Sequence, residues 1–194
     1  MNERDTLKIN DKGHLEIGGM DAVEIAKKFG TPIYVFDEQH IRNMMRVYKN
    51  TIDRDYSGNG IVLYASKAFS CMSIYAIANQ ENIGVDVVSG GELFTAIKAG
   101  FPADKIYMHG NNKLISELNF AIDSKVGTIV VDSYREADIL DSLCAERKIK
   151  QNVLIRINPG VEAHTHAFVQ TARTDSKFGF SVSDGAAENM TAHV

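Results

Sequence analysis

The sequence predicts an α/β protein that forms part of a (β/α)8 TIM-type barrel, preceded by a short β-hairpin segment. The first observation is a regular alternation of short apolar runs with amphipathic segments, which is typical of βαβ units and a parallel sheet. The second is that each apolar run ends in polar residues. The third is the Gly-rich loop Ser89–Glu92, which opens a helix but lacks the GxGxxG spacing of a dinucleotide fold. The absence of that spacing favours the barrel over a doubly wound open sheet.

Composition limits the classes of function. The 194 residues are 44% hydrophobic and 24% charged, enough for a sizeable core, and the formal net charge of −4 argues against nucleic acid or an anionic membrane as partner. Cys71 and Cys144 are far apart and form no metal-ligand pattern, which indicates thiols in a reducing compartment. No signal peptide or apolar run of bilayer length is visible. A cytoplasmic protein is expected.

The N-terminal segment begins with a predicted hairpin. Apolar and polar residues alternate on both sides of Asp11–Gly13, which places Leu7 and Ile9 opposite Leu15 and Ile17.

Two capped helices are expected next, with a strand between them. Asp21 is a suitable N-cap for a helix that stops at Gly30. Ile33–Phe36 reads as a strand, and Asp37 caps a helix to about Thr51 with one apolar face.

The remainder of the chain repeats a strand–helix unit at intervals of 21 to 24 residues. Strands are expected to begin near Ile61, Val85, Ile106, Ile129 and Val153, with helices over 70–80, 91–99, 113–123 and 133–147. About five units are countable, whereas a closed barrel needs eight, and a further helix begins after Ser181–Gly185. We therefore expect an incomplete barrel over 37–194, preceded by an N-terminal segment over 1–36.

Polar side chains at the strand ends form the candidate site. The strand ends carry Ser66 and Lys67, Ser89, His109, Asp132, and Asn158 after Arg156. In a barrel these ends converge on the face that holds the active site. Lys67 follows a buried strand, where desolvation favours a nucleophilic amine able to form a Schiff base; the alternative is a lysine that begins a surface loop.

Several of these motifs resemble a known family. Tyr64–Ala68, Val85–Leu93 and Arg156–Val161 resemble the fold-type III pyridoxal-phosphate decarboxylases, whose barrel is of the alanine racemase-like class. His164-Thr165-His166 and Asp175–Phe180 are similar to the diaminopimelate decarboxylases within it. The resemblance extends from about Gly30 to Phe180, in the family's order and spacing.

The resemblance implies a cofactor, a reaction and a set of site residues. Lys67 would be the catalytic residue, holding pyridoxal 5'-phosphate as a Schiff base that the amino-acid substrate displaces. The ring would accept the electrons released as the carboxylate leaves, converting meso-2,6-diaminopimelate to L-lysine in lysine biosynthesis. Asp86, Arg156 and His109 would contact the cofactor.

Each of these contact residues has a plainer alternative. Asp86 and His109 could be ordinary hydrogen-bonding residues at strand ends, and Glu92 could cap the helix that Gly90 opens. Arg156 needs an anionic partner inside an apolar strand, and Glu92 or Asp86 would serve.

Other functions remain open at this point. The family's phosphate site, its acidic partner for the pyridine nitrogen and the residues exchanged across its homodimer have no counterpart in this sequence, so the chain alone is expected to be inactive or weakly active. Alternatives are decarboxylation of D-ornithine, ornithine, arginine or carboxynorspermidine, or a non-catalytic pyridoxal-phosphate-binding or regulatory role. His164 and His166 have no further Cys or His beside them, so no metal is expected.

Overall fold

The protein is described by a computed structural model that covers residues 6–160 and 178–194. By internal contacts the chain divides into two compact units. One comprises Met1–Val62 with Gln80–Ile83, and the other comprises Leu63–Asn79 with Gly84–Val194. The two units are described separately. The boundary between 36 and 37 that the sequence suggests stays a prediction.

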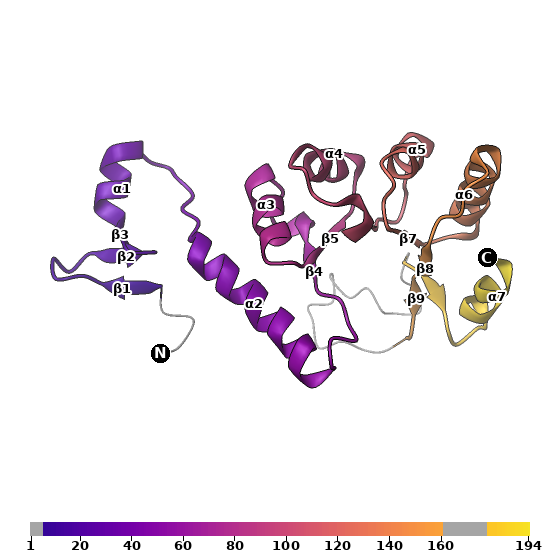
Figure 1. Cartoon of the computed structure of the whole chain (residues 1–194), viewed down its shortest axis with the longest axis horizontal. Coiled ribbons are helices and arrows are strands. Elements are labelled where there is room, and N and C mark those ends of the chain that lie inside the picture. Colours follow the sequence, from indigo (N-terminus) through magenta and orange to yellow (C-terminus); the bar gives the residue numbers. More distant parts are fainter. Residues whose placement is uncertain (1–5, 161–177) are drawn as a thin grey trace. The chain divides into compact units, whose positions relative to one another are not determined.

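The first unit opens with a three-stranded antiparallel sheet (Figure 1). Its strands are β1 (Leu7–Ile9), β2 (Leu15–Ile17) and β3 (Met20–Asp21). Leu7 pairs with Ile17 and Ile9 with Leu15, so the predicted hairpin is confirmed in its register.

Helix α1 (Ala22–Phe29) begins and ends as its capping residues predict. Asp21 Oδ1 accepts hydrogen bonds from the amides of Val23 (2.8 Å) and Glu24 (3.4 Å), and Asp21 Oδ2 lies 2.9 Å from His14 Nδ1. Gly30 ends the helix with φ of 81°, a conformation that suits glycine. The Asp21 carboxylate thus joins the hairpin to α1.

The Asp21 junction is expected to weaken in acid. The hydrogen bond from His14, followed by those from Asn10 and the helix amides, holds the pKa of Asp21 well below its usual range. A depressed pKa means that the carboxylate favours the folded hairpin above about pH 4 and that this contribution falls as the pH decreases toward the folded pKa. NMR signals of His14 and Val23 should therefore shift below about pH 4. Asp21→Asn should abolish that dependence, and an unchanged acid transition in this variant would contradict it.

The predicted strand over Ile33–Phe36 is wrong: these residues form no strand. Tyr34 is 91% exposed, and Ile33, Val35 and Phe36 are also exposed. An apolar run becomes a strand only when a neighbouring strand supplies its hydrogen bonds. In the described chain no strand lies hydrogen-bonded beside Ile33–Phe36.

The second predicted cap is confirmed. Asp37 accepts a hydrogen bond from the His40 amide and begins helix α2 (Glu38–Asp55), which runs four residues beyond the expected end at Thr51.

The second unit contains a five-stranded parallel sheet in the order β4-β5-β6-β7-β8. Its strands are β4 (Leu63–Ala65), β5 (Gly84–Val87), β6 (Ile106–Met108), β7 (Thr128–Val131) and β8 (Val153–Ile155). The crossover helices are α3 (Met72–Gln80), α4 (Gly90–Lys98), α5 (Ile115–Asp123) and α6 (Tyr134–Arg147). The five predicted units of a partial barrel are confirmed.

The core lies between this sheet and its helices, which succeed one another along one side of the strands (Figure 1). In the three central strands every second residue is fully buried, namely Val85 and Val87 of β5, Ile106 and Met108 of β6, and Ile129 and Val131 of β7. The residues between them, such as Asp86, Tyr107 and Val130, are only half-buried. This two-residue period assigns apolar side chains to the helical side and leaves the other side of the sheet for polar ones.

The end of the chain adds a strand that the sequence did not suggest. After β8 the chain continues as β9 (Ile157–Asn158), which pairs in parallel with β10 (Phe180–Ser181). Helix α7 (Ala186–His193) then follows, as expected from Ser181–Gly185.

Candidate functional site at the strand ends

The carboxyl ends of the parallel strands form one edge of the sheet, and the predicted site residues belong to it. Ala65 pairs with Asp86, and Asp86 pairs with Tyr107, so the residues that follow β4, β5 and β6 are neighbours in register. A hydrogen bond of 2.7 Å from the His109 amide to the Val87 carbonyl extends this register beyond the end of β6.

Lys67 lies in a single 3-10 turn, η1 (Ser66–Ala68), directly after β4. Its side chain is exposed, whereas Ser66 beside it is fully buried. The expectation that burial at the strand end desolvates the amine is therefore wrong for this structure. The reason is that the turn directs residue 66, and not residue 67, into the protein.

Asp86 and His109 lie together as the sequence suggested. His109 Nδ1 is 3.6 Å from Asp86 Oδ2. The side chain of His109 is 30% exposed and that of Asp86 is 26% exposed. Asp86 Oδ1 and His109 Nε2 are buried and have no hydrogen-bond partner in the described chain. Because buried polar atoms are nearly always paired, these two atoms are open positions for a ligand's polar groups. With the Lys67 amine on the same edge, they fit pyridoxal phosphate.

Arg156 finds its anionic partner on the neighbouring strand end. Its Nη1 donates to Asp132 Oδ2 at 3.1 Å, and the guanidinium lies 4.3 Å from the centre of the Phe178 ring. Asp132 is 2% exposed, and its Oδ1 accepts a 2.5 Å hydrogen bond from the Gly179 amide. The suggestion that Glu92 or Asp86 pairs with Arg156 is wrong. Arg156 follows β8, which lies beside β7 and Asp132.

Glu92 instead joins two strand ends to helix α4. Its Oε2 accepts hydrogen bonds from Ser66 Oγ (2.6 Å) and from the Val88 amide (2.9 Å). Its own amide donates to the capping Ser89 hydroxyl at 3.2 Å. The alternative that Glu92 caps this helix is therefore wrong: Ser89 is the N-cap of α4, and the Glu92 carboxylate bonds to groups outside the helix.

A buried ion pair on this edge was missed by sequence reasoning. Lys113 Nζ is 2.6 Å from Glu136 Oε1 and donates 2.7 Å hydrogen bonds to the carbonyls of Gly110 and Val130. The side chains are 2% and 6% exposed, and burial raises the pKa of Glu136 against the opposing effect of Lys113. The signal available was Glu136 three residues after Ser133, a capping pattern, but nothing local shows that Lys113 is buried.

Some sequence-based expectations lie elsewhere. His164, His166 and 175–177 are outside the described residues. Cys71 is half-buried and Cys144 buried, and both are free.

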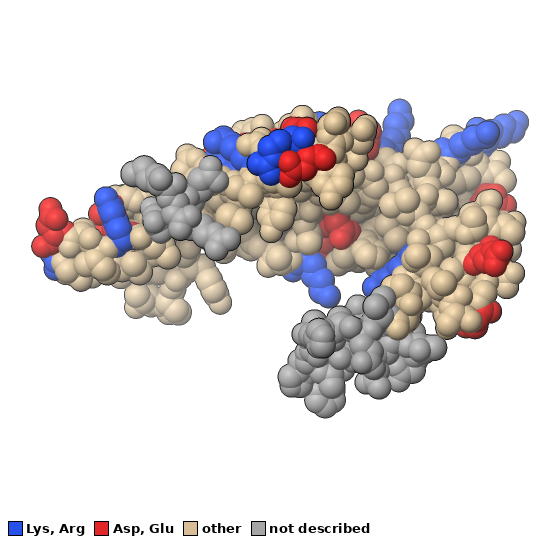
Figure 2. All heavy atoms as spheres, turned by 90° about the horizontal axis from the view of Figure 1, so that it is seen from below, with Lys and Arg blue, Asp and Glu red and all other residues tan. Residues whose placement is uncertain are grey.

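Over residues 6–160 and 178–194, no three His, Cys, Asp or Glu side chains gather as metal ligands, and no helix has the length and apolar character to cross a bilayer. On the face shown in Figure 2, basic and acidic side chains are interspersed.

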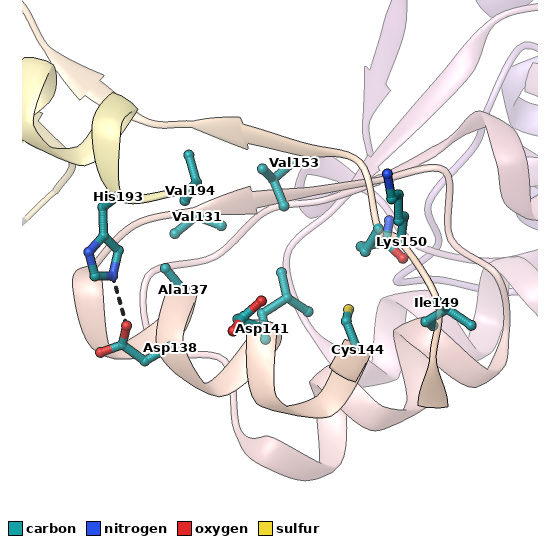
Figure 3. A pocket seen from close by; sticks show the side chains of 12 residues that line it. Val131, Ala137, Asp138, Asp141, Cys144, Ile149, Lys150, Val153, His193 and Val194 are labelled. Atoms are coloured by element: carbon teal, nitrogen blue, oxygen red, sulfur yellow. Dashed lines mark hydrogen bonds and ion pairs between the residues drawn. The ribbon is translucent and has the colours of Figure 1, made fainter. Parts of the chain in front are cut away.

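A cavity of about 490 Å³ is lined by residues of α6, β7, β8 and α7 (Figure 3). Its lining includes Val131, Cys144 and Val153, and His193 Nε2 pairs with Asp138 Oδ1 at 2.8 Å at its side. None of Lys67, Asp86, His109 and Arg156 lines it. The predicted site residues therefore lie outside this cavity.

Comparison with known proteins identifies relatives of the chain. Residues 38–193 match the family model described as the pyridoxal-binding domain of pyridoxal-dependent decarboxylases. Diaminopimelate decarboxylases of Bacillus methanolicus and Bacillus subtilis are 51% and 46% identical over 94% and 97% of this chain. The chain spans 42% and 43% of their lengths.

The solved structures that resemble this chain include diaminopimelate decarboxylases, as do its sequence relatives. Diaminopimelate decarboxylase of M. jannaschii in complex with L-lysine superposes with a TM-score of 0.85 at 35% identity, over 99% of this chain and 45% of that one. The enzyme of Helicobacter pylori, also with L-lysine, has a TM-score of 0.76 at 27% identity, over 85% of this chain and 41% of that one. With its half-barrel sheet, its lysine at the end of β4 and the match over residues 38–193, the chain belongs to the pyridoxal-dependent decarboxylase family.

Proposed function

We propose that this chain carries the lysine-bearing part of an amino-acid decarboxylase that uses pyridoxal phosphate, with meso-diaminopimelate as substrate and L-lysine as product. The observation that carries the proposal is the strand-end edge, where the exposed Lys67 amine accompanies two buried polar atoms without partners, in a chain matched to the family's pyridoxal-binding domain. The choice of substrate is supported by relatives named as diaminopimelate decarboxylases. A cytoplasmic enzyme that works as a homodimer is part of the same proposal.

Each residue of the edge has a chemical role in this proposal. Lys67 Nζ would hold the cofactor through its aldehyde group, and as a free amine it would move a proton beside the bound substrate. Bound pyridoxal phosphate supplies the sink for the electrons that the departing carboxylate leaves behind. Asp86 Oδ1 would accept a hydrogen bond from the bound group, and His109 Nε2 would offer it a second polar contact.

Arg156 has a different part in the site. Its charge is already neutralised by Asp132 and its Cζ lies 4.3 Å from the centre of the Phe178 ring, so it would orient bound groups as a fixed donor and add no net charge to the edge.

The proposal is tested by locating the cofactor on the chain. The purified chain is incubated with pyridoxal phosphate, reduced with borohydride to make the covalent link permanent, and digested for peptide mass spectrometry. We expect the label on Lys67 in the wild-type chain and its loss to background in Lys67→Ala. Lys98→Ala, which removes another lysine outside the edge, should keep the label. Equal labelling of many lysines, or a label that survives Lys67→Ala, would contradict the proposal.

Release of carbon dioxide separates the enzyme from a protein that only binds the cofactor. Labelled Lys67 with turnover of meso-diaminopimelate supports the proposed reaction. Turnover of ornithine or arginine in its place would reassign the substrate. Labelling without turnover agrees both with the low activity expected of this chain alone and with a non-catalytic pyridoxal-phosphate-binding role, so only turnover decides between them.

A further inference from the structure

The turn that carries Lys67 is held by the residue before it. In η1 the Lys67 side chain is exposed and Ser66 is fully buried. The turn has no side-chain cap of its own at Ala65. A three-residue 3-10 turn has few internal hydrogen bonds, so contacts of the buried serine decide where its backbone lies.

Ser66 Oγ has two acceptors within reach. It lies 2.6 Å from Glu92 Oε2 and 2.8 Å from the Asp86 carbonyl oxygen, which share its single proton. The same Glu92 oxygen accepts from the Val88 amide at 2.9 Å. One carboxylate oxygen therefore joins the end of β4 to the end of β5. A hydrogen bond to a charged acceptor is stronger than one between neutral groups.

The later helices allow a direct comparison. Glu92, Glu117 and Glu136 each occupy the third position of their helices, α4, α5 and α6, and each contacts the preceding βα unit. Glu117 Oε1 accepts from the Gly90 amide at 2.6 Å, and Glu136 pairs with Lys113. Of these three glutamates, only Glu92 contacts the turn of Lys67 in the described chain.

We propose that Glu92 is a positioning residue for Lys67 and acts through the Ser66 hydroxyl. The inference rests on the proposed function, in which the Lys67 amine bonds to pyridoxal phosphate. By holding Ser66 against the end of β5, Glu92 fixes the direction in which the next residue, Lys67, leaves the sheet edge. Loss of the contact frees the turn while the rest of α4 keeps its Ser89 cap.

The test compares four variants of the full chain. Glu92→Leu and Ser66→Ala remove the contact. Glu92→Gln keeps it, because both donors converge on one oxygen and an amide oxygen can replace it. Glu117→Leu is the matched control: it removes the equivalent glutamate of the next helix and leaves the Lys67 turn untouched.

Three readouts are taken under conditions where every variant is folded: the rate of pyridoxal-phosphate trapping on Lys67, the rate of Lys67 modification by a small amine-directed reagent, and hydrogen exchange of residues 66–68. In Glu92→Leu and Ser66→Ala we expect trapping on Lys67 to slow about fivefold, the factor equivalent to one net hydrogen bond, with faster exchange in the turn. Glu117→Leu should match the wild-type chain, and Glu92→Gln, which keeps a neutral acceptor, should stay closer to the wild-type chain than to Glu92→Leu.

The outcomes separate this inference from the proposed function. If Glu92→Leu and Glu117→Leu slow the trapping equally, or if Glu92→Gln behaves like Glu92→Leu, the positioning role is refuted. If the wild-type chain does not trap pyridoxal phosphate on Lys67, the proposed function fails. The amine reagent and the exchange of residues 66–68 then still decide whether Glu92 holds the turn.

Discussion

Lys113→Met is expected to lower the free energy of unfolding by about 3–5 kcal/mol, the usual cost of removing one partner from a buried ion pair. Lys113 and Glu136 are 2% and 6% exposed, and the Lys113 ammonium also satisfies the carbonyls of Gly110 and Val130. Methionine fills similar space but leaves the Glu136 carboxylate buried without its cation. Urea unfolding followed by NMR signals of β6 and β7 measures the loss.

Two further variants test the reason for that loss. Lys49→Met breaks an exposed pair with Asp53 on α2 and should cost no more than about 0.5 kcal/mol. The double variant Lys113→Met/Glu136→Leu replaces both charges and should recover most of the stability, because apolar pairs often substitute well for buried ion pairs. A loss in Lys113→Met as small as that in Lys49→Met would contradict the argument.

The pH dependence of the single variant has a definite sign. Burial already raises the pKa of Glu136, and removal of Lys113 raises it further. An acid whose pKa is raised in the folded state destabilises the protein most above that pKa, and this cost decreases as the pH falls from the folded pKa to the unfolded one. The deficit of Lys113→Met relative to the wild-type chain should therefore shrink as the pH falls.

Gly127→Ala is the second change with a large expected effect. A Cβ at Gly127 would collide with the carbonyl oxygen of Asp104 and lie 2.7 Å from its carbon, and both are backbone atoms that a rotamer change does not move. The Gly127 amide also donates to the Ala103 carbonyl at 2.8 Å, which holds the two segments together. We expect a loss of about 3 kcal/mol in unfolding free energy, at the upper end of overpacking effects.

Gly91→Ala is the matched control for that change. Gly91 lies in α4, and the nearest atom to its Cβ would be Ser89 Oγ at 3.8 Å, an ordinary contact. Alanine in a helix is favoured over glycine by about 0.5–1 kcal/mol, so this variant should be as stable as the wild-type chain or slightly more stable. Thermal unfolding of the two variants side by side measures the difference. Equal melting temperatures would show that the segment around Asp104 yields to the added carbon.

Local patterns explain why much of the fold was predictable. Each helix start that rests on a capping aspartate, Asp21 or Asp37, is confirmed, because the cap and the amides it bonds are within three residues of each other. The strand starts of the sheet agree within two residues, because burial on the helical side imposes a two-residue period that the sequence itself displays. The alternation of strands and helices then favours few topologies other than a parallel sheet.

Predictions that needed a distant partner were less successful. Ile33–Phe36 has the composition of a strand but no neighbouring strand, and Arg156 pairs with Asp132 where Glu92 or Asp86 was expected. Strand β10 was missed because two residues of pairing leave no periodic signal. In each case the deciding contact joins residues far apart in the chain, and the register of the sheet determines which of them meet.

The features of the candidate site also separate into those that the local sequence determines and those that depend on contacts between distant residues. The sequence by itself determined that a lysine follows the first barrel strand, that Asp86 and His109 end the next two, and that these ends share an edge, since period and order are local properties of the chain. Only the tertiary structure decided that Lys67 is exposed, that Ser66 and Glu92 hold its turn, and that Lys113 is buried with Glu136. Burial and hydrogen-bond partners depend on how strands and helices pack, and packing brings together side chains whose separation in the sequence carries no sign of it.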